Sequence, residues 1–283
     1  MGQIIINGLL MGFIYSLVAI GLSLTWGTMG IPNFAHGDFL MIGMYIAFWL
    51  FELFAIDPLI ALPVCIILLF IFGVLSFKGI ISRVIDGASL TALLATFGFG
   101  MFLKNFAQFL WTPNFRYIND AFVSGKTIKL GEIVIGVPQV VASIGSILLT
   151  LVIMYFMDKT RTGKAIKATA LNKSTALLMG INTKRIYAIT FGITGACVGA
   201  AGALMSSFFP INPTLGSLFS TISLVIVALG GLGSIKGALY GGLIIGLTEA
   251  LGGYYLGTQF KYLLVFLIYL IVIQVKPKGL FGW

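Results

Sequence analysis

The stretch IIINGLLMGFIYSLVAIGLSLT, residues 4–25, decides the fold because it carries no charged side chain over the length of a membrane-spanning helix. About 20 apolar residues in a helix cross a hydrocarbon core of about 30 Å. No lysine or arginine precedes Lys78, so the basic region that begins a signal peptide is missing. We therefore expect this segment to remain as a membrane span.

The rest of the chain has the same character. Of its 283 residues, 59% are hydrophobic and only 9% are charged, and the mean hydropathy is +1.09. So few charges cannot cover a water-soluble globule, which argues against a soluble enzyme, a disordered chain and a disulfide-rich secreted protein. The two cysteines, Cys65 and Cys197, lie within apolar runs, where we expect them to pack as small apolar side chains without forming a disulfide.

The pattern of apolar runs predicts an all-α integral membrane protein, a polytopic bundle of about nine (eight to ten) transmembrane helices in a single domain, residues 1–283. The runs are long and apolar on every face, which favours helices over a barrel. Glycine and proline at 21–32 and 209–216 indicate that some helices are broken or re-entrant, and small residues spaced by four predict close helix packing. The runs are 4–25, 34–55, 58–76, 88–111, 138–157, 186–208, 217–232, 238–253 and 260–275.

The basic residues predict the orientation in the membrane. One set of alternate loops holds twelve of the 17 lysines and arginines, which marks that side as cytoplasmic and places the N-terminus outside and the C-terminus inside. The external loop 112–137 belongs to the opposite set, whose charges, Glu132 among them, cancel. The net charge of +9 thus reflects membrane orientation, and we expect no nucleic-acid partner. The twelve are Lys78, Arg83, Lys159, Arg161, Lys164, Lys167, Lys173, Lys184, Arg185, Lys236, Lys276 and Lys278.

Sequence motifs for nucleotide and metal binding are incomplete. The Gly125–Lys126–Thr127 stretch has Asp120 where a phosphate-binding loop needs its first glycine. His36 is the single histidine, so a metal would lack ligands. We expect the chain itself to bind no metal and no cofactor, and to have no catalytic residues.

The segment Asn33 to Asp38 places an amide, an imidazole and a carboxylate at the start of a predicted span. If the segment is helical, Asn33, His36 and Gly37 share one face and Asp38 points elsewhere. A structural interpretation is equally open, in which Asn33 caps the helix and Asp38 complements its dipole.

Two further charges lie within spans. Lys104 is about 21 Å along its run from Leu90, near enough to the outer surface for its ammonium group to reach water, which favours an interfacial role. Glu249 is about 16 Å into a run from Ala238, where a carboxylate is costly and should face a cavity or a partner. Glu249 is therefore the stronger candidate for a functional role.

The largest cytoplasmic loop, 158–185, is predicted to contain two short helices, 163–171 and 174–179. Asn172 begins a turn and cap between them, and Gly180 ends the second. Their alanine-rich faces are too small to form a core, so the loop is expected to bind a partner surface; attachment to anionic lipid is the alternative.

Four separated stretches resemble the permeases of branched-chain amino acid ABC importers, the LivH type of the LivH/LivM family. GLSLTWG at 21–27 runs into GIPNFAHGDFL at 30–40, and the loop from GKA at 163–165 to LMGIN at 178–182 is similar to the coupling loop of that family. GGLGSIKGA at 230–238 is also similar, although many relatives carry proline where this chain has Lys236, and KPKGLFG at 276–282 matches the basic-Pro-x-Gly ending.

The resemblance implies a non-catalytic permease subunit of the inner membrane that translocates branched-chain amino acids by alternating access. Its implied partners are a second, related permease, two cytoplasmic ATP-binding subunits that carry ATP and Mg²⁺, and a periplasmic or surface substrate-binding protein. The residues assigned to the substrate pathway are Asn33, His36, Gly37, Asp38, Gly98, Gly231 and Glu249. Those assigned to the ATPase-coupling loop are Gly163, Lys164, Ala168, Ala170, Asn172, Ala176 and Gly180.

Three alternatives stay open. Permeases for urea, short amides and related amino acids share the Asn-x-Ala-His-Gly motif, so the substrate is not fixed by it. An ion-coupled secondary transporter acting alone would use Glu249, His36 and Asp38 for coupling. A passive channel is disfavoured because it would not need an ordered cytoplasmic loop.

Overall fold

The computed structural model describes residues 1–131, 133–257 and 259–281, so Glu132 of the predicted external loop and Gly282 of the C-terminal motif lie outside the described residues. Within this part of the chain, each predicted apolar run forms a helix. These helices are α1 (Gly2–Met29), α2 (His36–Phe54), α3 (Pro58–Ser76), α5 (Ser89–Trp111), α6 (Val137–Lys159), α9 (Thr183–Met205), α10 (Leu215–Gly230), α11 (Ile235–Tyr255) and α12 (Lys261–Val275).

The count of nine crossings is not confirmed. Among the described residues, six helices are long and apolar enough to cross a membrane, or seven spans if the bent pair α10–α11 counts as one. The axes of that pair differ by 118°. Helix α10 has 16 residues and α12 has 15, which corresponds to about 24 and 22 Å and falls short of a bilayer core of about 30 Å. Each apolar run therefore predicted a helix correctly, but it did not predict the bend between two helices or whether a helix is long enough to cross the membrane.

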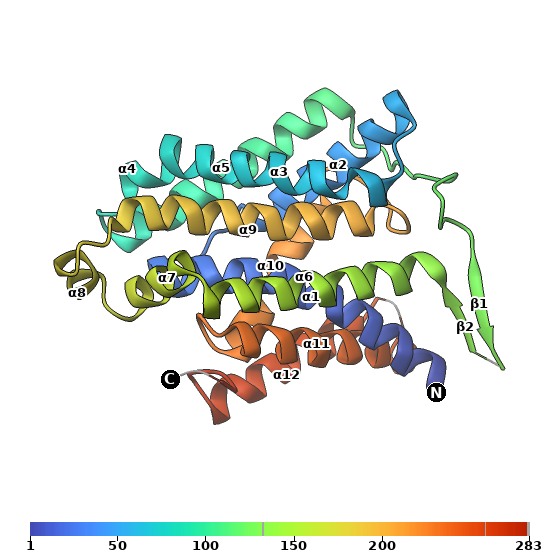
Figure 1. Cartoon of the computed structure of the whole chain (residues 1–283). Coiled ribbons are helices and arrows are strands. Elements are labelled where there is room, and N and C mark those ends of the chain that lie inside the picture. Colours follow the sequence, from blue (N-terminus) through green and yellow to red (C-terminus); the bar gives the residue numbers. More distant parts are fainter. Residues whose placement is uncertain (132, 258, 282–283) are drawn as a thin grey trace.

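The helices lie side by side with α1 and α9 near the centre (Figure 1). Helix α9 contacts α2 and α3 on one side, and α1 contacts α11 on the other. Helix α3 continues through a π-helical turn, η1 (Phe77–Ile81), into the short α4 (Ser82–Val84). The N-terminus and the C-terminus lie at opposite ends of the bundle (Figure 1).

Loop 112–137, which is predicted to be external, contains a β-hairpin that was not predicted from the sequence. Strands β1 (Thr127–Leu130) and β2 (Ile133–Gly136) pair antiparallel, with Thr127 opposite Gly136. Each strand has four residues, too few for the alternation that identifies strands in sequence. The side-chain amide of Gln3 in α1 donates a hydrogen bond of 2.6 Å to the Val134 carbonyl oxygen, which attaches the hairpin to the bundle.

Glycines allow the helix backbones to touch. Between α1 and α11, a Cβ atom added at Gly12 would lie 2.9 Å from the Cα of Leu243. Between α3 and α9, a Cβ atom added at Gly73 would lie 2.5 Å from the Phe191 carbonyl oxygen. The predicted small-residue packing is therefore present, and both cysteines are buried and free as expected. No hydrophobic force draws helices together in lipid, so the van der Waals packing that small residues allow must hold them together.

The C-terminal tail closes the end of α10. The backbone N–H groups of Leu280 and Phe281 donate to the carbonyl oxygens of Leu229 and Gly230, at 2.8 and 3.0 Å. These carbonyls belong to the last turn of α10, where the helix itself supplies no partner. Gly279, with a positive φ of 82°, lets the tail turn close to the α10–α11 bend. The basic-Pro-x-Gly motif thus has a structural role at this bend.

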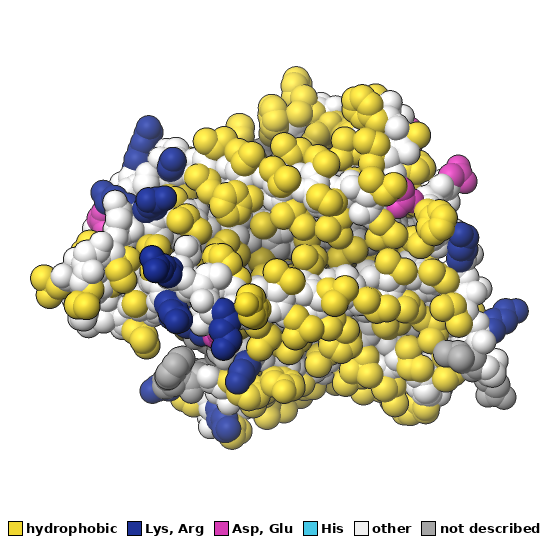
Figure 2. Space-filling view, viewed as in Figure 1, with side chains coloured by type: hydrophobic (Ala, Val, Ile, Leu, Met, Phe, Trp, Pro, Cys, Tyr) yellow, Lys and Arg dark blue, Asp and Glu magenta, His cyan; other side chains and the backbone are white. Residues whose placement is uncertain are grey.

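The surface divides into an apolar middle and charged ends. Figure 2 shows hydrophobic side chains over most of this face and lysine and arginine side chains gathered at the end where Figure 1 places α4, α7 and the C-terminus. Large apolar side chains of α3, α5, α6 and α12 are exposed, as expected for helices that face lipid.

We predict that Gly73→Ala lowers the free energy of unfolding by about 1–3 kcal/mol, because the added methyl group would push α3 away from α9. Gly79→Ala, six residues further along the same span in the π-helical turn η1, is the control, since a Cβ atom there meets nothing within 4 Å. Thermal unfolding in detergent measures both. Equal midpoints for the two variants would contradict the role given to the contact at Gly73.

Candidate functional site

The start of α2 lies deep in the bundle, not at a membrane surface. His36 is fully buried, and its Nε2 lies 2.8 Å from the carbonyl oxygen of Val18, halfway along α1. Because α1 continues to Met29, residues 30–35 run back along the bundle as irregular backbone before α2 begins. Non-helical backbone at such depth is stable only where protein buries it or where it lines a cavity.

Hydrogen bonds from neighbouring residues hold this irregular segment. Ser220 of α10 accepts a hydrogen bond from the Gly37 N–H at 2.8 Å and donates one to the Phe34 carbonyl oxygen at 2.9 Å. The Asn33 Oδ1 accepts from the Ala35 N–H at 3.1 Å. The expectation that Asn33 caps the helix is wrong, because Ala35 is the N-cap and Asn33 lies two residues before it, in a local side-chain turn.

Asp38 lies in the first turn of α2 and is only 5% exposed. Two glycines from other helices pack against its carboxylate, Gly100 of α5 and Gly216 of α10. A Cβ atom added at Gly100 would lie 2.6 Å from the Asp38 Oδ2. Among the described residues, no side chain or backbone group forms a hydrogen bond or ion pair with this carboxylate.

Asp38 opens into a cavity of about 390 Å³ between α2, α5 and α10, here called the Asp38 cavity. Its wall combines two charged groups, three hydroxyl groups and several apolar side chains. The lining residues are Phe34, Asp38, Phe97, Gly100, Met101, Lys104, Ser217, Ser220, Thr221 and Leu224. Of the pathway residues assigned from sequence, only Asp38 lies on this wall.

Lys104 is the residue of this site that the sequence analysis missed. It lies one turn beyond Gly100 on α5, and its side chain lines the same cavity as Asp38. In the described structure Lys104 forms no ion pair with Asp38, so the two opposite charges face a common space without touching. Its depth along the run suggested the membrane interface, but depth alone does not tell which neighbours a side chain meets.

The other assigned pathway residues lie elsewhere. Gly37 is a packing position, where an added Cβ atom would overlap the Gly216 carbonyl oxygen. Gly98 is on an open face of α5, where an added Cβ atom meets nothing within 4 Å. Gly231, with φ 104°, ends α10 at the bend beside the C-terminal tail. Their role in a pathway stays a prediction.

Glu249 joins three helices at a second cavity of about 440 Å³. Its carboxylate accepts a hydrogen bond of 2.7 Å from the Tyr15 hydroxyl group of α1 and pairs with the Lys261 ammonium group of α12 at 2.6 Å. Glu249, His36 and Asp38 thus face different neighbours, and the structure does not bring together the three groups that an ion-coupled transporter was expected to use.

The predicted helices of loop 158–185 are present as α7 (Arg161–Leu171) and α8 (Lys173–Leu178). Asn172 is the N-cap of α8, where its side chain accepts from the Thr175 N–H at 3.0 Å, and Gly180 has a φ of 79° just after α8. Gly163 packs closely against Met157 at the end of α6, and Ala176 is buried. Lys164 and Ala170 are exposed, and Ala168 is partly exposed.

Large apolar side chains cover the tip of this loop. Leu178 and Met179 are 88% and 78% exposed, and Leu171 and Leu177 are exposed beside them. The coupling residues predicted from the sequence include alanines of this loop but none of these four side chains, although a Leu-Leu-Met sequence in a basic loop is a visible signal.

Ion pairs attach the loop to the bundle. The Lys173 ammonium group lies 2.9 Å from Asp86, in the turn before α5. This hydrogen bond and the positive charge of Lys173 lower the pKa of Asp86, and the same hydrogen bond raises the pKa of Lys173. The pair is therefore intact at neutral pH, and it is lost when acid protonates Asp86 or when strong base deprotonates Lys173.

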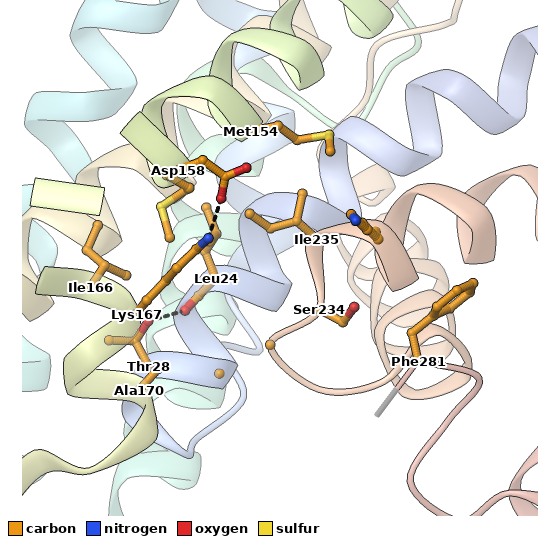
Figure 3. A pocket seen from close by; sticks show the side chains of 14 residues that line it. Leu24, Thr28, Met154, Asp158, Ile166, Lys167, Ala170, Ser234, Ile235 and Phe281 are labelled. Carbon is orange, nitrogen blue, oxygen red and sulfur yellow. Dashed lines mark hydrogen bonds and ion pairs between the residues drawn. The ribbon is translucent and has the colours of Figure 1, made fainter. Parts of the chain in front are cut away.

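At the base of the loop is a cavity of about 360 Å³ (Figure 3). Asp158 of α6 and Lys167 of α7 form an ion pair across it, and Ser234 and Phe281 line the side of the α10–α11 bend. This cavity therefore lies between α7 on one side and the α10–α11 bend and the tail on the other.

Comparisons with known proteins agree with one another. A family model described as the permease component of branched-chain amino acid transport systems matches residues 4–274. The high-affinity branched-chain amino acid transport permease BraD of Pseudomonas aeruginosa is 32% identical over 293 residues, which covers 99% of this chain and 95% of BraD. The permease LivH of Escherichia coli K12, described in the same words, is 33% identical over 295 residues with the same coverage.

A probable LivH permease of Methanocaldococcus jannaschii is 31% identical over 262 residues, covering 92% of this chain and 82% of that protein. Among solved structures, PsaBC from Streptococcus pneumoniae in complex with a Fab matches with a TM-score of 0.51 and 15% identity, over 97% of this chain and 92% of that chain. The latter likeness supports the fold alone.

We predict that Glu249→Ala lowers the free energy of unfolding by about 2–3 kcal/mol, because it leaves the Lys261 ammonium group without its partner in a partly buried place. Glu52→Gln, which removes an exposed carboxylate from α2, is the control and should have little effect. Thermal unfolding in detergent distinguishes the two, and an unchanged midpoint for Glu249→Ala would show that the three-helix cluster does not stabilise the protein.

Proposed function

The chain belongs to the family of permease components of branched-chain amino acid transport systems, and on this premise we propose how it works as the membrane subunit of an ABC importer. As such a permease it carries branched-chain amino acids across the membrane. ATP is hydrolysed on partner chains. This chain provides the pathway for the substrate and the surface on which the partner chains act to change its conformation.

The exposed apolar tip of α7 and α8 is the observation that carries this proposal. Four large apolar side chains would be costly to leave in water, and the loop that presents them is helical, capped and attached by ion pairs. A segment that only adhered to lipid through its lysines would not need these features. We assign the tip to the contact with a cytoplasmic ATP-binding subunit.

Motion at this tip has a direct route into the bundle. Helix α7 contacts α1, α6 and α9, and Gly163 packs on the end of α6. A push on α7 would close the cavity at the base of the loop and tilt α1, which holds the start of α2 through His36. The Asp38 cavity would then open alternately to the two sides of the membrane.

The proposed orientation follows the charges. The end with α7, α8 and most lysines and arginines faces the cytoplasm, and the end with the N-terminus and the β-hairpin faces outward (Figures 1 and 2). A substrate-binding protein would deliver the amino acid at the hairpin end. A second, related permease would complete the membrane part in the inner, or plasma, membrane.

The ATP requirement is tested by reconstituting the chain with its partner permease, ATP-binding subunits and binding protein in liposomes. We expect uptake of labelled leucine to require ATP on the side of the membrane where the ATP-binding subunits lie. Uptake should stop when the phosphate-binding lysine of the ATP-binding subunits is replaced. Uptake that continues after this replacement would overturn the proposal and favour an independent transporter.

For the loop, we predict that Leu178→Asp reduces copurification of the ATP-binding subunits by about tenfold or more, because a charge would replace the most exposed apolar side chain of the proposed contact. The matched control is Phe122→Asp, which makes the same kind of change at an exposed side chain in the external loop. If both variants retain the ATP-binding subunits equally, the docking assignment is wrong.

A further inference from the structure

We propose that the Asp38 cavity binds an amino acid as a zwitterion, with the Asp38 carboxylate receiving the α-ammonium group and the Lys104 ammonium receiving the α-carboxylate. The inference rests on the proposed function and adds to it the two residues that recognise the substrate. It also assigns Lys104, which sequence reasoning placed at the membrane interface, to specificity.

The unpaired charges provide the first argument. Asp38 is almost completely buried within the bundle, yet in the described structure its carboxylate forms no hydrogen bond or ion pair, and Lys104 on the same cavity wall also forms no ion pair. A buried charge without a partner is costly, and opposite charges at this depth are expected to be paired. A ligand that carries both charges satisfies both residues at once.

The shape of the cavity provides the second argument. Gly100 and Gly216 pack directly against the Asp38 carboxylate, so a side chain at either position would collide with it. The Asp38 side chain also lines the cavity, which is where a ligand ammonium group would meet it. The Ser217 and Thr221 hydroxyl groups, which donate to backbone carbonyl oxygens, keep lone pairs free to accept from it as well.

The apolar part of the wall provides the third argument. Phe97, Met101 and Leu224 line the cavity beside the charged residues, and Phe97 packs edge-to-face on Phe34 at 6.3 Å between ring centroids. An aliphatic side chain attached to the zwitterion fits this surface. Urea and short amides carry no charges for Asp38 and Lys104, so the geometry favours aliphatic amino acids over the uncharged substrates that share the sequence motif.

A cysteine-protection experiment tests occupancy of the cavity without changing either charge. Met101→Cys and Phe102→Cys place a thiol at adjacent exposed positions of α5, of which only position 101 lines the cavity. The native cysteines are both buried, and the unmodified assembly provides the labelling baseline. The assembled transporter without binding protein is treated with a maleimide in the presence of leucine, 4-methylpentanoate or 3-methylbutylamine.

We expect leucine to slow labelling at position 101 at least threefold and to leave position 102 unchanged. The two analogues lack the ammonium or the carboxylate group and should give no protection at the same concentration. Equal protection by all three compounds would show that the cavity senses only the apolar side chain, and no protection by leucine would show that leucine does not occupy it; either result overturns the inference.

The two charges are tested by transport. In the reconstituted importer, Asp38→Asn and Lys104→Met should each reduce ATP-driven leucine uptake by about tenfold or more, since each removes a charge-assisted hydrogen bond to the ligand. Asp38→Glu and Lys104→Arg should restore part of it. Glu52→Gln on α2 and Lys129→Met in β1 are the controls, because both side chains lie away from the cavity.

These results separate the inference from the function on which it rests. If uptake by the unmodified importer does not depend on ATP, the proposed function fails. If uptake depends on ATP but Asp38→Asn and Lys104→Met transport leucine as well as the controls do, the importer assignment stands and the zwitterion site is wrong. Copurification with the ATP-binding subunits shows whether each variant is assembled. If a variant does not assemble, its transport result is not used, and the cysteine-protection experiment decides whether leucine occupies the cavity.

Discussion

Contact between helix backbones at glycine positions is the constraint on which the rest of the structure depends. In lipid there is no hydrophobic force to bring helices together, so close packing must supply the attraction. The contacts of α1 with α11 and of α3 with α9 produce a dense centre in which α9 is the most enclosed of the long helices. Such a centre buries Asn33 and Ala35 of the irregular segment 30–35 and places two glycines against the Asp38 carboxylate.

Helices and their ends were predictable because their signals are local. Apolar runs located the membrane helices, and Asn172 and Gly180 marked the ends of the short loop helices through interactions within a few residues. The number of crossings was not predictable in the same way. Whether α10 and α11 form one span or two depends on a bend of 118°, and contacts with distant helices and the C-terminal tail set that bend. The four-residue strands of the hairpin were too short to recognise.

The candidate site shows the same division between local and distant information. Asp38 stood out because a carboxylate in an apolar run is rare and costly. His36 and Glu249 stood out for similar reasons, yet the structure uses them for contacts between helices, with Val18 in one case and with Tyr15 and Lys261 in the other. Sequence spacing could not distinguish these uses, nor could it bring Lys104 to the same wall as Asp38. That arrangement depends on how α5 and α10 pack around the start of α2.

The closure of α10 by the C-terminal tail has a consequence for biogenesis. The carbonyl oxygens of Leu229 and Gly230 receive their partners from Leu280 and Phe281, at the far end of the chain. A ribosome synthesises these partners about 50 residues after α10, when α11 and α12 have already been made. The bend between α10 and α11 is therefore completed only after residues 280–281 have emerged from the ribosome, and until then the end of α10 lacks these two hydrogen-bond donors.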